Sequence, residues 1–261
     1  MTSTLRCFRL MESLAREPYE LTLAEICAEH DLPKGSAHRL MSTLVESGFV
    51  EQDSGTKRYR LAGKALWMGG AYLRHSTLYR VAFPVVQDLS KRVDGMVHLG
   101  AWDHESVLYL HTVGPPSALY LFADTGERRP LHATGLGKAM LAFRPESDLE
   151  SVFSRPVEAY TEKTITSIEA MREELERIRA EGYAFDDEEG VAGLRCVAAP
   201  IWDRSGAACG AISASAAAEE VVGARRAELG AIIREGALRV SVQMGFRPKT
   251  TNLASLLGKS R

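Results

Sequence analysis

Short hydroxyl and cationic side chains gather between Pro33 and Arg60, in a pattern suited to a nucleic acid duplex. Hydroxyl, imidazole, ammonium and guanidinium groups are the side chains that hydrogen-bond to phosphates and base edges. The candidate DNA-binding residues are Lys34, Ser36, His38, Arg39, Ser42, Thr43, Lys57, Arg58 and Arg60. This span holds five Lys and Arg residues against three Asp and Glu residues, whereas the whole chain has a net charge of -2. The local excess of cations favours contact with a phosphate backbone.

An amphipathic helix would carry the first six of these residues. Apolar side chains recur there at helical spacing, which predicts one buried face. They are Ala37, Leu40, Met41, Leu44 and Val45. Pro33 and Gly48 are typical of the start and the end of such a helix. An ordinary surface helix would show the same pattern, so the helix alone does not establish a function.

The segments on either side make the prediction more specific. Residues 49–61 have turn chemistry at 53–56 and predict a hairpin rich in cations. A first helix predicted upstream has an inward stripe of Leu5, Phe8, Met11 and Leu14. A capping box at Thr22–Glu25 then opens a second helix, which ends at His30–Asp31, a few residues before the next helix begins. Three helices, the last two joined by a tight turn, and a basic hairpin are typical of a winged helix-turn-helix domain that binds double-stranded DNA.

Composition argues against several other classes of protein. With 261 residues, 45% of them hydrophobic and 25% charged, the chain is typical of a soluble globular protein of one to two domains. No apolar run has the length of a membrane span, and charges interrupt the N-terminal segment, so we expect a cytoplasmic protein with no secretory signal and no membrane partner. Cys7, Cys27, Cys196 and Cys209 lack CxxC or Cys/His spacing, so we expect no disulfide framework, no metal and no cofactor.

Changes of pattern divide the chain into four predicted segments. Residues 1–62 would form the DNA-binding domain. Residues 63–93 would form a connecting helical segment, weakened at Gly69–Gly70 and kinked or restarted at Pro84, whose apolar surface is a candidate contact of a homodimer. Residues 94–246 would form a second domain of mixed α and β structure. Residues 247–261 contain four cations and no acids, which predicts a flexible basic tail.

Within the second domain, paired apolar runs predict two hairpins, at 96–113 and 195–215, and a further strand at 119–122. Helices are predicted at 167–182 and 219–244. Alternation places Ser213 and Ser215 on one face of the last strand. Two hydroxyl groups on one face of an otherwise apolar strand need hydrogen-bond partners.

The segment 131–142 passes from a loop into a helix. The backbone N–H groups of Gly135, Leu136 and Gly137 would therefore line a helix N-terminus, where an anion can bind. The segment lacks the pattern of a nucleotide-binding P-loop, and Met140 stands where the dinucleotide fingerprint needs its third glycine. A loop that only caps the helix is the more common explanation of such a pattern.

Four sequence blocks are spread over nearly the whole chain. They read PKGSAHRLMSTLVESGFV, HATGLGKAMLA, RIRAEGYAFDDEEGVAGLRCVAAPIWD and GAISAS. In their order and spacing, these blocks resemble those of IclR-type bacterial transcription regulators. The resemblance implies an α+β chain with an N-terminal winged helix-turn-helix domain, a connecting helix and a GAF-like effector-binding domain. It also implies dimers or tetramers on a palindromic operator, and control of that binding by a small metabolite, often an organic or aromatic acid.

The same resemblance places an effector pocket at Gly135, Leu136, Asp186, Cys196, Ser213 and Ser215. We add Gly137 as a backbone donor, and Leu119 and Met140 as apolar cover. The loop amides and both serines would donate hydrogen bonds to a carboxylate or carbonyl of the ligand, while Asp186 would accept one from it. The chain departs from the family pattern at Gly135, Gly190 and Ala216–Ala217, where Ala, a larger residue and Gly-Pro are common, so a changed pocket is expected.

Two other classes of function compete with a regulator. Cys196 could be the nucleophile of a thiol-dependent hydrolase if a base lay within reach, which could be His98, His104, His111 or His132. A cysteine in an apolar strand is usually inert, however. A metal sensor is the third possibility, but no pair of histidines has metal-ligand spacing.

Overall fold

The computed structural model describes residues 2–115 and 125–247. Contacts divide the chain into two compact units, Met1–His75 and Ser76–Arg261. The strand predicted at 119–122, with Leu119, lies outside the described residues, as does the predicted tail after Arg247. In the part that is described, no helix is both long and apolar enough to cross a bilayer.

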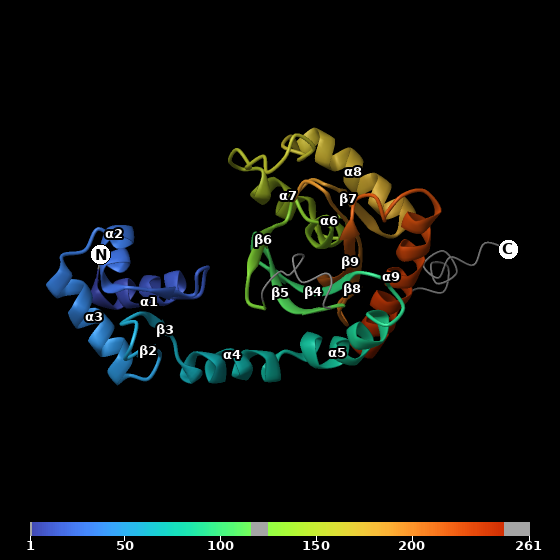
Figure 1. The fold of residues 1–261 in the computed structure, drawn as a ribbon. Helices are drawn as coiled ribbons and strands as arrows, with labels where there is room; N and C mark the ends of the chain where they lie inside the picture. The colour runs from blue at the N-terminus through green and yellow to red at the C-terminus, as the bar shows by residue number, and fades with distance from the viewer. Residues whose placement is uncertain (1, 116–124, 248–261) are drawn as a thin grey trace. The chain divides into compact units, whose positions relative to one another are not determined.

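The N-terminal unit is a winged helix-turn-helix domain followed by one more helix (Figure 1). Its helices are α1 (Ser3–Leu14), α2 (Leu23–His30), α3 (Lys34–Glu46) and α4 (Gly63–His75). Its strands are β1 (Glu20–Leu21), β2 (Val50–Gln52) and β3 (Tyr59–Leu61), in the antiparallel order β1-β3-β2. The hairpin of β2 and β3, which we call the wing, follows α3 as the sequence predicts.

Local signals explain why these helices begin and end where they do. The capping box is confirmed, because Thr22 caps the N-terminus of α2 while the Glu25 side chain accepts from the Thr22 amide. Only three residues separate α2 from α3, and Pro33 is the N-cap of α3. Gly48, just after the last turn, has a φ of 76°, which glycine adopts without strain. The predicted bounds of α3 are therefore confirmed.

Two of the predicted inward stripes are partly wrong. The core of the unit contains Leu10, Leu14, Ile26, Met41 and Tyr59, but Leu5 and Phe8 on α1 are 45% and 58% exposed. Val45 on α3 is likewise 38% exposed. Helical spacing shows that a face is apolar, but the surrounding elements decide how much of it is covered.

The predicted connecting segment at 63–93 consists of two separate helices. The break falls at Ser76, whose hydroxyl accepts from the Tyr79 amide and caps α5 (Thr77–Leu89). Neither Gly69–Gly70 nor Pro84 breaks a helix: both glycines lie inside α4 and Pro84 lies inside α5. An N-cap hydroxyl stabilises the start of the helix that follows it by accepting from one of its first free amides.

A six-stranded antiparallel sheet forms the centre of the second unit, in the order β6-β5-β4-β9-β8-β7. Its strands are β4 (Met96–Asp103), β5 (Ser106–Val113), β6 (Arg128–Pro130), β7 (Ala184–Asp187), β8 (Leu194–Trp202) and β9 (Ala208–Ala217). Both predicted hairpins are present, as β4–β5 and β8–β9. Sequence analysis missed the two short edge strands, β6 and β7.

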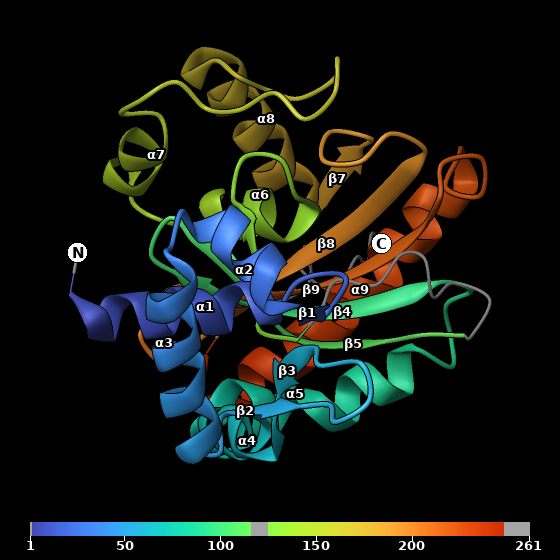
Figure 2. The ribbon, with the colours of Figure 1, turned by 60° about the vertical axis from the view of Figure 1, so that its left-hand side comes forward.

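Helices cover both faces of this sheet (Figure 2). They are α5, α6 (Gly135–Leu141), α7 (Glu146–Val152), α8 (Ile168–Glu181) and α9 (Ala224–Gln243). Helices α5 and α9 pack together on one face, while α6 packs on the other face and α8 packs against α6. From Gly210 onward the odd-numbered residues of β9 face α6, because Ala211 belongs to its apolar cluster, whereas Gly210 meets Leu78 of α5.

Candidate functional site

The glycine loop enters α6 through a hydroxyl cap. Thr134 is the N-cap residue, and its Oγ1 accepts from the Gly137 amide at 3.1 Å and donates to the Pro130 carbonyl at 2.8 Å. A β-carbon at position 137 would overlap the backbone of Leu131, so only glycine fits there. The Gly137 amide is therefore used in holding the loop, and Gly137 does not line the cavity described below.

Polar residues lie in register across the sheet face beneath this loop. One row joins Asp186 on β7, Cys196 on β8 and Ser215 on β9. Ser213, two residues before Ser215 and on the same face, is paired with His98 on β4. The sheet thus brings together four of the residues predicted from the sequence, and it adds His98.

A cavity of about 220 Å³ lies between these residues and the glycine loop. Its walls include the predicted Gly135, Leu136, Asp186, Cys196, Ser213 and Ser215, together with His98, Tyr109, Arg129, Thr134 and residues 190–194. Met140 does not line it: this side chain is fully buried in the apolar cluster beneath α6. The expectation that Met140 covers a ligand in this pocket is thus wrong, because helical periodicity turns it toward the core. The volume, below that of a drug-sized pocket, suits a small metabolite.

The carboxylate of Asp186 is already bound by the protein. Its Oδ1 accepts from the Glu189 amide at 2.8 Å, and the amides of Gly135 and Gly190 lie close enough to influence this carboxyl group. Burial raises the pKa of Asp186, while Lys138 and these amides act to lower it. The carboxylate thus fastens the glycine loop to the 188–190 turn. Gly190 permits this closure, since a β-carbon there would lie 2.5 Å from the Ala133 carbonyl oxygen.

Lys138 forms a buried ion cluster behind the cavity. Its side chain is fully buried, and Nζ donates to Glu189 Oε1 at 2.5 Å, to Glu174 Oε1 at 3.0 Å and to the Phe185 carbonyl at 2.7 Å. Arg177 adds a second, exposed cation against Glu174. Burial raises the pKa of Glu189. One ammonium thus joins α6, α8, β7 and the turn that follows it.

Three further titratable groups of the cavity wall, His98, Tyr109 and Cys196, are uncharged at neutral pH. Burial lowers the pKa of His98 to about 4, and the ring lies 3.0 Å from the Thr112 hydroxyl through Nδ1. Burial also raises the pKa of the Tyr109 hydroxyl and of the Cys196 thiol. The Ser215 hydroxyl donates to Cys196 Sγ at 3.0 Å. The cavity therefore offers several neutral donors and acceptors, which are the groups that orient a small ligand.

Sequence analysis missed His98, Tyr109 and Arg129 as wall residues. His98 and Tyr109 lie on the predicted 96–113 hairpin. Strand alternation would identify them as wall residues once the hairpin is known to pair with the strand of Ser213. Arg129 belongs to a three-residue edge strand that has no clear sequence signal.

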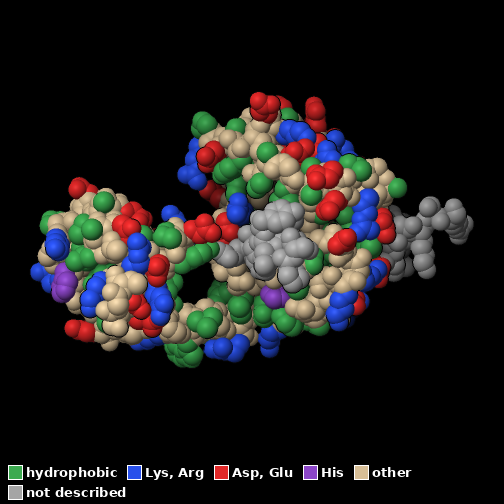
Figure 3. All heavy atoms as spheres, in the orientation of Figure 1, with side chains coloured by type: hydrophobic (Ala, Val, Ile, Leu, Met, Phe, Trp, Pro, Cys, Tyr) green, Lys and Arg blue, Asp and Glu red, His purple; other side chains and the backbone are tan. Residues whose placement is uncertain are grey.

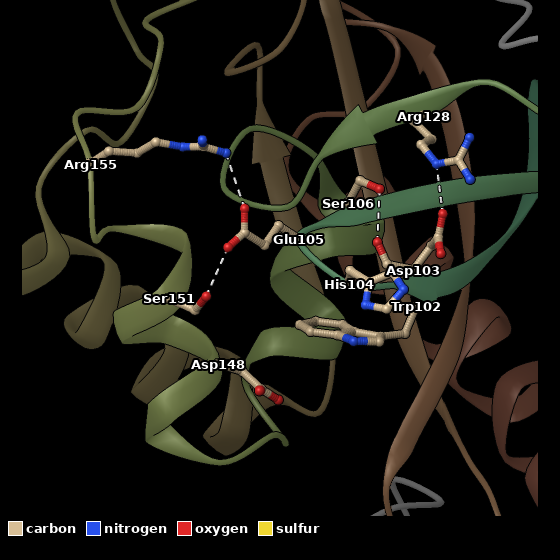
Figure 4. A pocket seen from close by; sticks show the side chains of 9 residues that line it. All are labelled: Trp102, Asp103, His104, Glu105, Ser106, Arg128, Asp148, Ser151 and Arg155. Atoms are coloured by element: carbon tan, nitrogen blue, oxygen red, sulfur yellow. Dashed lines mark hydrogen bonds and ion pairs between the residues drawn. The ribbon is translucent and has the colours of Figure 1, made fainter. Parts of the chain in front are cut away.

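A second cleft at the turn of the β4–β5 hairpin is polar and open (Figure 4). Its charged groups are paired with one another: Arg128 with Asp103 at 2.6 Å, and Arg155 with Glu105 at 3.1 Å. Asp148 is held by Arg144. Such saturated surface pairs leave little with which to bind a ligand.

The N-terminal unit presents the predicted DNA-binding residues on one side of α3. Lys34, His38, Arg39 and Thr43 are exposed, and Ser36 and Ser42 are half-buried. Cationic and histidine side chains gather at this side of the unit (Figure 3). A groove lined by Thr22, Lys34, His38, Gln52 and Lys57 runs between the starts of α2 and α3 and the wing.

Two cations of the wing are engaged within the unit. Arg58 hydrogen-bonds to Glu25 and to the Glu20 carbonyl, both at 3.2 Å, and so fastens the wing to α2. Arg60 Nε lies 2.6 Å from Glu51 Oε1 on the neighbouring strand. Lys34, Arg39 and Lys57 form no ion pair with another described residue, so their charges are the more available ones.

Comparison with known proteins accounts for both units. The chain matches the family model "IclR helix-turn-helix domain" over residues 3–54 and "Bacterial transcriptional regulator IclR C-terminal" over residues 70–242. The chain belongs to the IclR family. It is a DNA-binding transcription regulator with a winged helix-turn-helix domain and an α+β effector domain.

Individual IclR-family proteins resemble it along nearly their full length. The HTH-type transcriptional regulator KdgR of Escherichia coli K12 is 31% identical over 247 residues, which is 94% of each protein. The crystal structure of Thermotoga maritima IclR has a TM-score of 0.80 at 28% identity, covering 94% of this chain and 99% of that one. An IclR homolog from Microbacterium hydrocarbonoxydans, crystallised with 4-hydroxybenzoate, has a TM-score of 0.80 at 26% identity, covering 93% and 99%. KdgR is named as a transcriptional regulator.

Lys138→Met should destabilise the effector domain by about 3–5 kcal/mol, because it leaves Glu174 and Glu189 buried without their shared cation. The loss should be smaller at pH 5 than at pH 8. A carboxyl whose folded pKa is raised contributes stability at low pH that is lost as the pH rises. Urea unfolding at both pH values measures the effect. Glu189→Gln added to Lys138→Met should restore part of the stability; a Lys138→Met protein as stable as the wild type would contradict this role.

Gly137→Ala and Gly135→Ala should differ although they lie two residues apart. At position 137 the methyl group meets the Leu131 backbone, so the free energy of unfolding should fall by about 1–3 kcal/mol. At position 135 the methyl group has ordinary contacts, 3.4 Å from the β-carbons of Ala198 and Cys196, so stability should change by less than about 1 kcal/mol. Equal destabilisation of the two variants in urea unfolding would refute this assignment.

Proposed function

We propose that this regulator binds its operator through α3 and the wing, and that a small organic or aromatic acid in the cavity beneath α6 alters operator affinity. The observation that carries the proposal is that cavity: a partly open space lined by hydrogen-bond donors and acceptors, in a chain whose other unit is a DNA-binding domain. The relative from M. hydrocarbonoxydans binds 4-hydroxybenzoate, a molecule of suitable size and polarity. A coupling free energy of about 1–3 kcal/mol between the two sites would make a useful switch.

On DNA, we assign Ser36, His38, Arg39 and Ser42 to the major groove. They lie on the uncovered side of α3, which follows a short helix and a tight turn as recognition helices do. Lys34 at the start of α3 and Lys57 in the wing would contact phosphates, with Thr43 beside them. Because Arg58 and Arg60 are paired with Glu25 and Glu51, we give them the role of holding the wing in place, with phosphate contact secondary.

We further propose that the protein is a homo-oligomer whose two DNA-binding units read a palindromic operator. Helix α4 has no buried residue, and its exposed apolar side chains lie close together in the sequence. They are Leu66, Trp67, Met68 and Tyr72, which are between 51% and 79% exposed. Exposed apolar surface on this scale is typical of a protein interface, and Leu5 and Phe8 of α1 extend the apolar surface of the unit. A two-fold axis through such a contact would match the symmetry of a palindrome.

Cys196 fits a ligand wall better than a catalytic nucleophile. Its raised thiol pKa disfavours the thiolate, and its described hydrogen bond comes from Ser215 and not from a histidine. Nor do the described residues include a cluster of three or more His, Cys, Asp or Glu side chains that could hold a metal ion. We therefore propose that the bound metabolite is sensed and is not transformed. Consumption of the metabolite by purified protein would contradict this.

The proposed function is tested by footprinting the DNA upstream of the protein's own gene and its neighbour, with and without small acids of the adjacent operon. We expect a protected palindrome whose occupancy changes with one of these acids. Absence of protection at low ionic strength would overturn the DNA-binding assignment, and protection that no acid alters would overturn the effector assignment.

Arg39→Ala and Lys57→Ala should have different effects on operator binding. Loss of a base contact at Arg39 should lower specific affinity by about 1–3 kcal/mol and leave binding to random DNA nearly unchanged. Loss of a phosphate contact at Lys57 should weaken both and reduce the salt slope of log K by about 0.9. Fluorescence anisotropy over a range of salt concentrations distinguishes the two, and identical effects on specific and random DNA would disprove the groove assignment.

Ser213→Ala should abolish or strongly weaken the effector response, because it removes a buried hydroxyl from the centre of the cavity wall. Ser205→Ala, in the β8–β9 turn outside the cavity, is the matched control. Calorimetric titration of the acid found by footprinting measures the change. Unaltered affinity in Ser213→Ala would remove Ser213 from the site.

A further inference from the structure

Arg129 is the single cationic side chain among the described residues that line the effector cavity. The other lining residues are uncharged at neutral pH, apart from the carboxyl group of Asp186, since His98 has a pKa of about 4. A cavity with one guanidinium and one carboxyl group has two electrostatically different ends. The position of these two groups therefore decides which way round a charged ligand binds.

The strand order separates the two groups to opposite edges of the sheet. Arg129 lies on β6, the outermost strand on one side, and Asp186 lies on β7, the outermost strand on the other. Arg129 is opposite Val107 on β5, and Val107 and Tyr109 are both in the apolar cluster of the α6 face. Arg129 thus emerges on the face of the sheet that bears the cavity. Arg128, its neighbour, emerges on the other side and lines the second cleft (Figure 4).

The guanidinium of Arg129 retains hydrogen-bonding capacity toward the cavity. Its Nε forms an ion pair with Glu127 Oε1 at 2.6 Å, although this buried N–H donates no hydrogen bond. Its two terminal NH₂ groups make no hydrogen bond to another described residue. A planar guanidinium with free terminal donors matches the two oxygens of a carboxylate.

The opposite end of the cavity is unsuited to a carboxylate. Asp186 would place a like charge beside it, and the Gly135 amide, expected from the sequence to bind an anion, lies beside Asp186 and acts to lower the pKa of that carboxyl group. The Gly137 amide is held by Thr134. Between the two ends lie neutral groups, chiefly Ser213, Ser215 and Tyr109, which can exchange hydrogen bonds with a hydroxyl or carbonyl oxygen.

We propose that Arg129 binds the carboxylate of the effector, so that the effector is a monocarboxylic acid whose uncharged hydroxyl or carbonyl end lies toward Ser213 and Ser215. This rests on the proposed function, in which the cavity is the effector pocket. It replaces the glycine loop with Arg129 as the carboxylate site, and it makes Arg129 the residue that selects acids over neutral analogues of the same shape.

The test compares acids with their amides on full-length protein. The probes are 4-hydroxybenzoate, benzoate and lactate, each paired with the corresponding amide, and binding is measured by calorimetry. We expect at least one acid to bind the wild type about tenfold or more tightly than its amide. Arg129→Met should lose about 10- to 100-fold in affinity for that acid and much less for the amide. Arg129→Lys should keep part of the preference, because it keeps the charge without the planar pair of donors.

Arg128→Met is the matched control, since it removes the adjacent arginine from the same strand but not from the cavity. It should bind acid and amide as the wild type does, and thermal melting confirms that all variants are folded. The proposal is overturned if the wild type binds neither acids nor amides, or binds both equally, or if Arg129→Met keeps its acid affinity. Acid that binds through Arg129 without altering operator occupancy would instead overturn the proposed function. Acid that shifts occupancy equally in wild type and Arg129→Met would leave that function standing and remove Arg129 from it.

Discussion

The geometry of the effector site depends on one buried ammonium group. Lys138 lies under the glycine loop with no solvent contact, and it draws Glu174 of α8 and Glu189 of the turn after β7 to the same point. Burying these charges costs free energy that their attraction only partly offsets, so the cluster is a weak source of net stability. The main effect of the cluster is to fix the positions of the elements that carry its charged groups. Because all the partners must meet one ammonium, the turn that carries Glu189 is held against α6, and Asp186 is brought within reach of the loop amides.

The glycines then determine how closely these parts approach. Position 137 lies against the backbone of Leu131, and position 190 lies against the carbonyl of Ala133, so both need the absence of a side chain. Gly135 is different, since a methyl group there would fit between Cys196, Ala198 and Asp186. The space left at position 135 belongs to the cavity. Two departures from the family pattern thus have different effects. Gly190 lets the 188–190 turn approach Ala133, and Gly135 leaves space in the wall of the effector cavity.

Much of this architecture is predictable because it follows from short-range patterns. The capping box of α2, the bounds of α3, both hairpins and the common face of Ser213 and Ser215 all follow from helical or strand periods. The sequence does not predict the edge strand β7 because aspartates are rare in strands, nor β6 because it has only three residues. The buried ion cluster of Lys138 is not predictable from local patterns, since the partners of Lys138 lie 36 and 51 residues further along the chain. The family resemblance predicts most of the residues that line the pocket. The charged residues around the pocket, Lys138 and Arg129, can be identified only from the tertiary structure.

The distribution of constraints over the sheet explains where selectivity can reside. Residues on the inner strands, such as His98, Cys196 and Ser213, are paired on both sides and packed under α6, so a change there disturbs several neighbours. Arg129 lies on an edge strand that pairs only with β5, and part of its side chain is exposed. A substitution at this position can alter the charge of the cavity with little effect on the fold, because fewer packed contacts depend on it. The inner strands therefore maintain the shape of the pocket, and the edge strand is where a different class of effector can be accommodated.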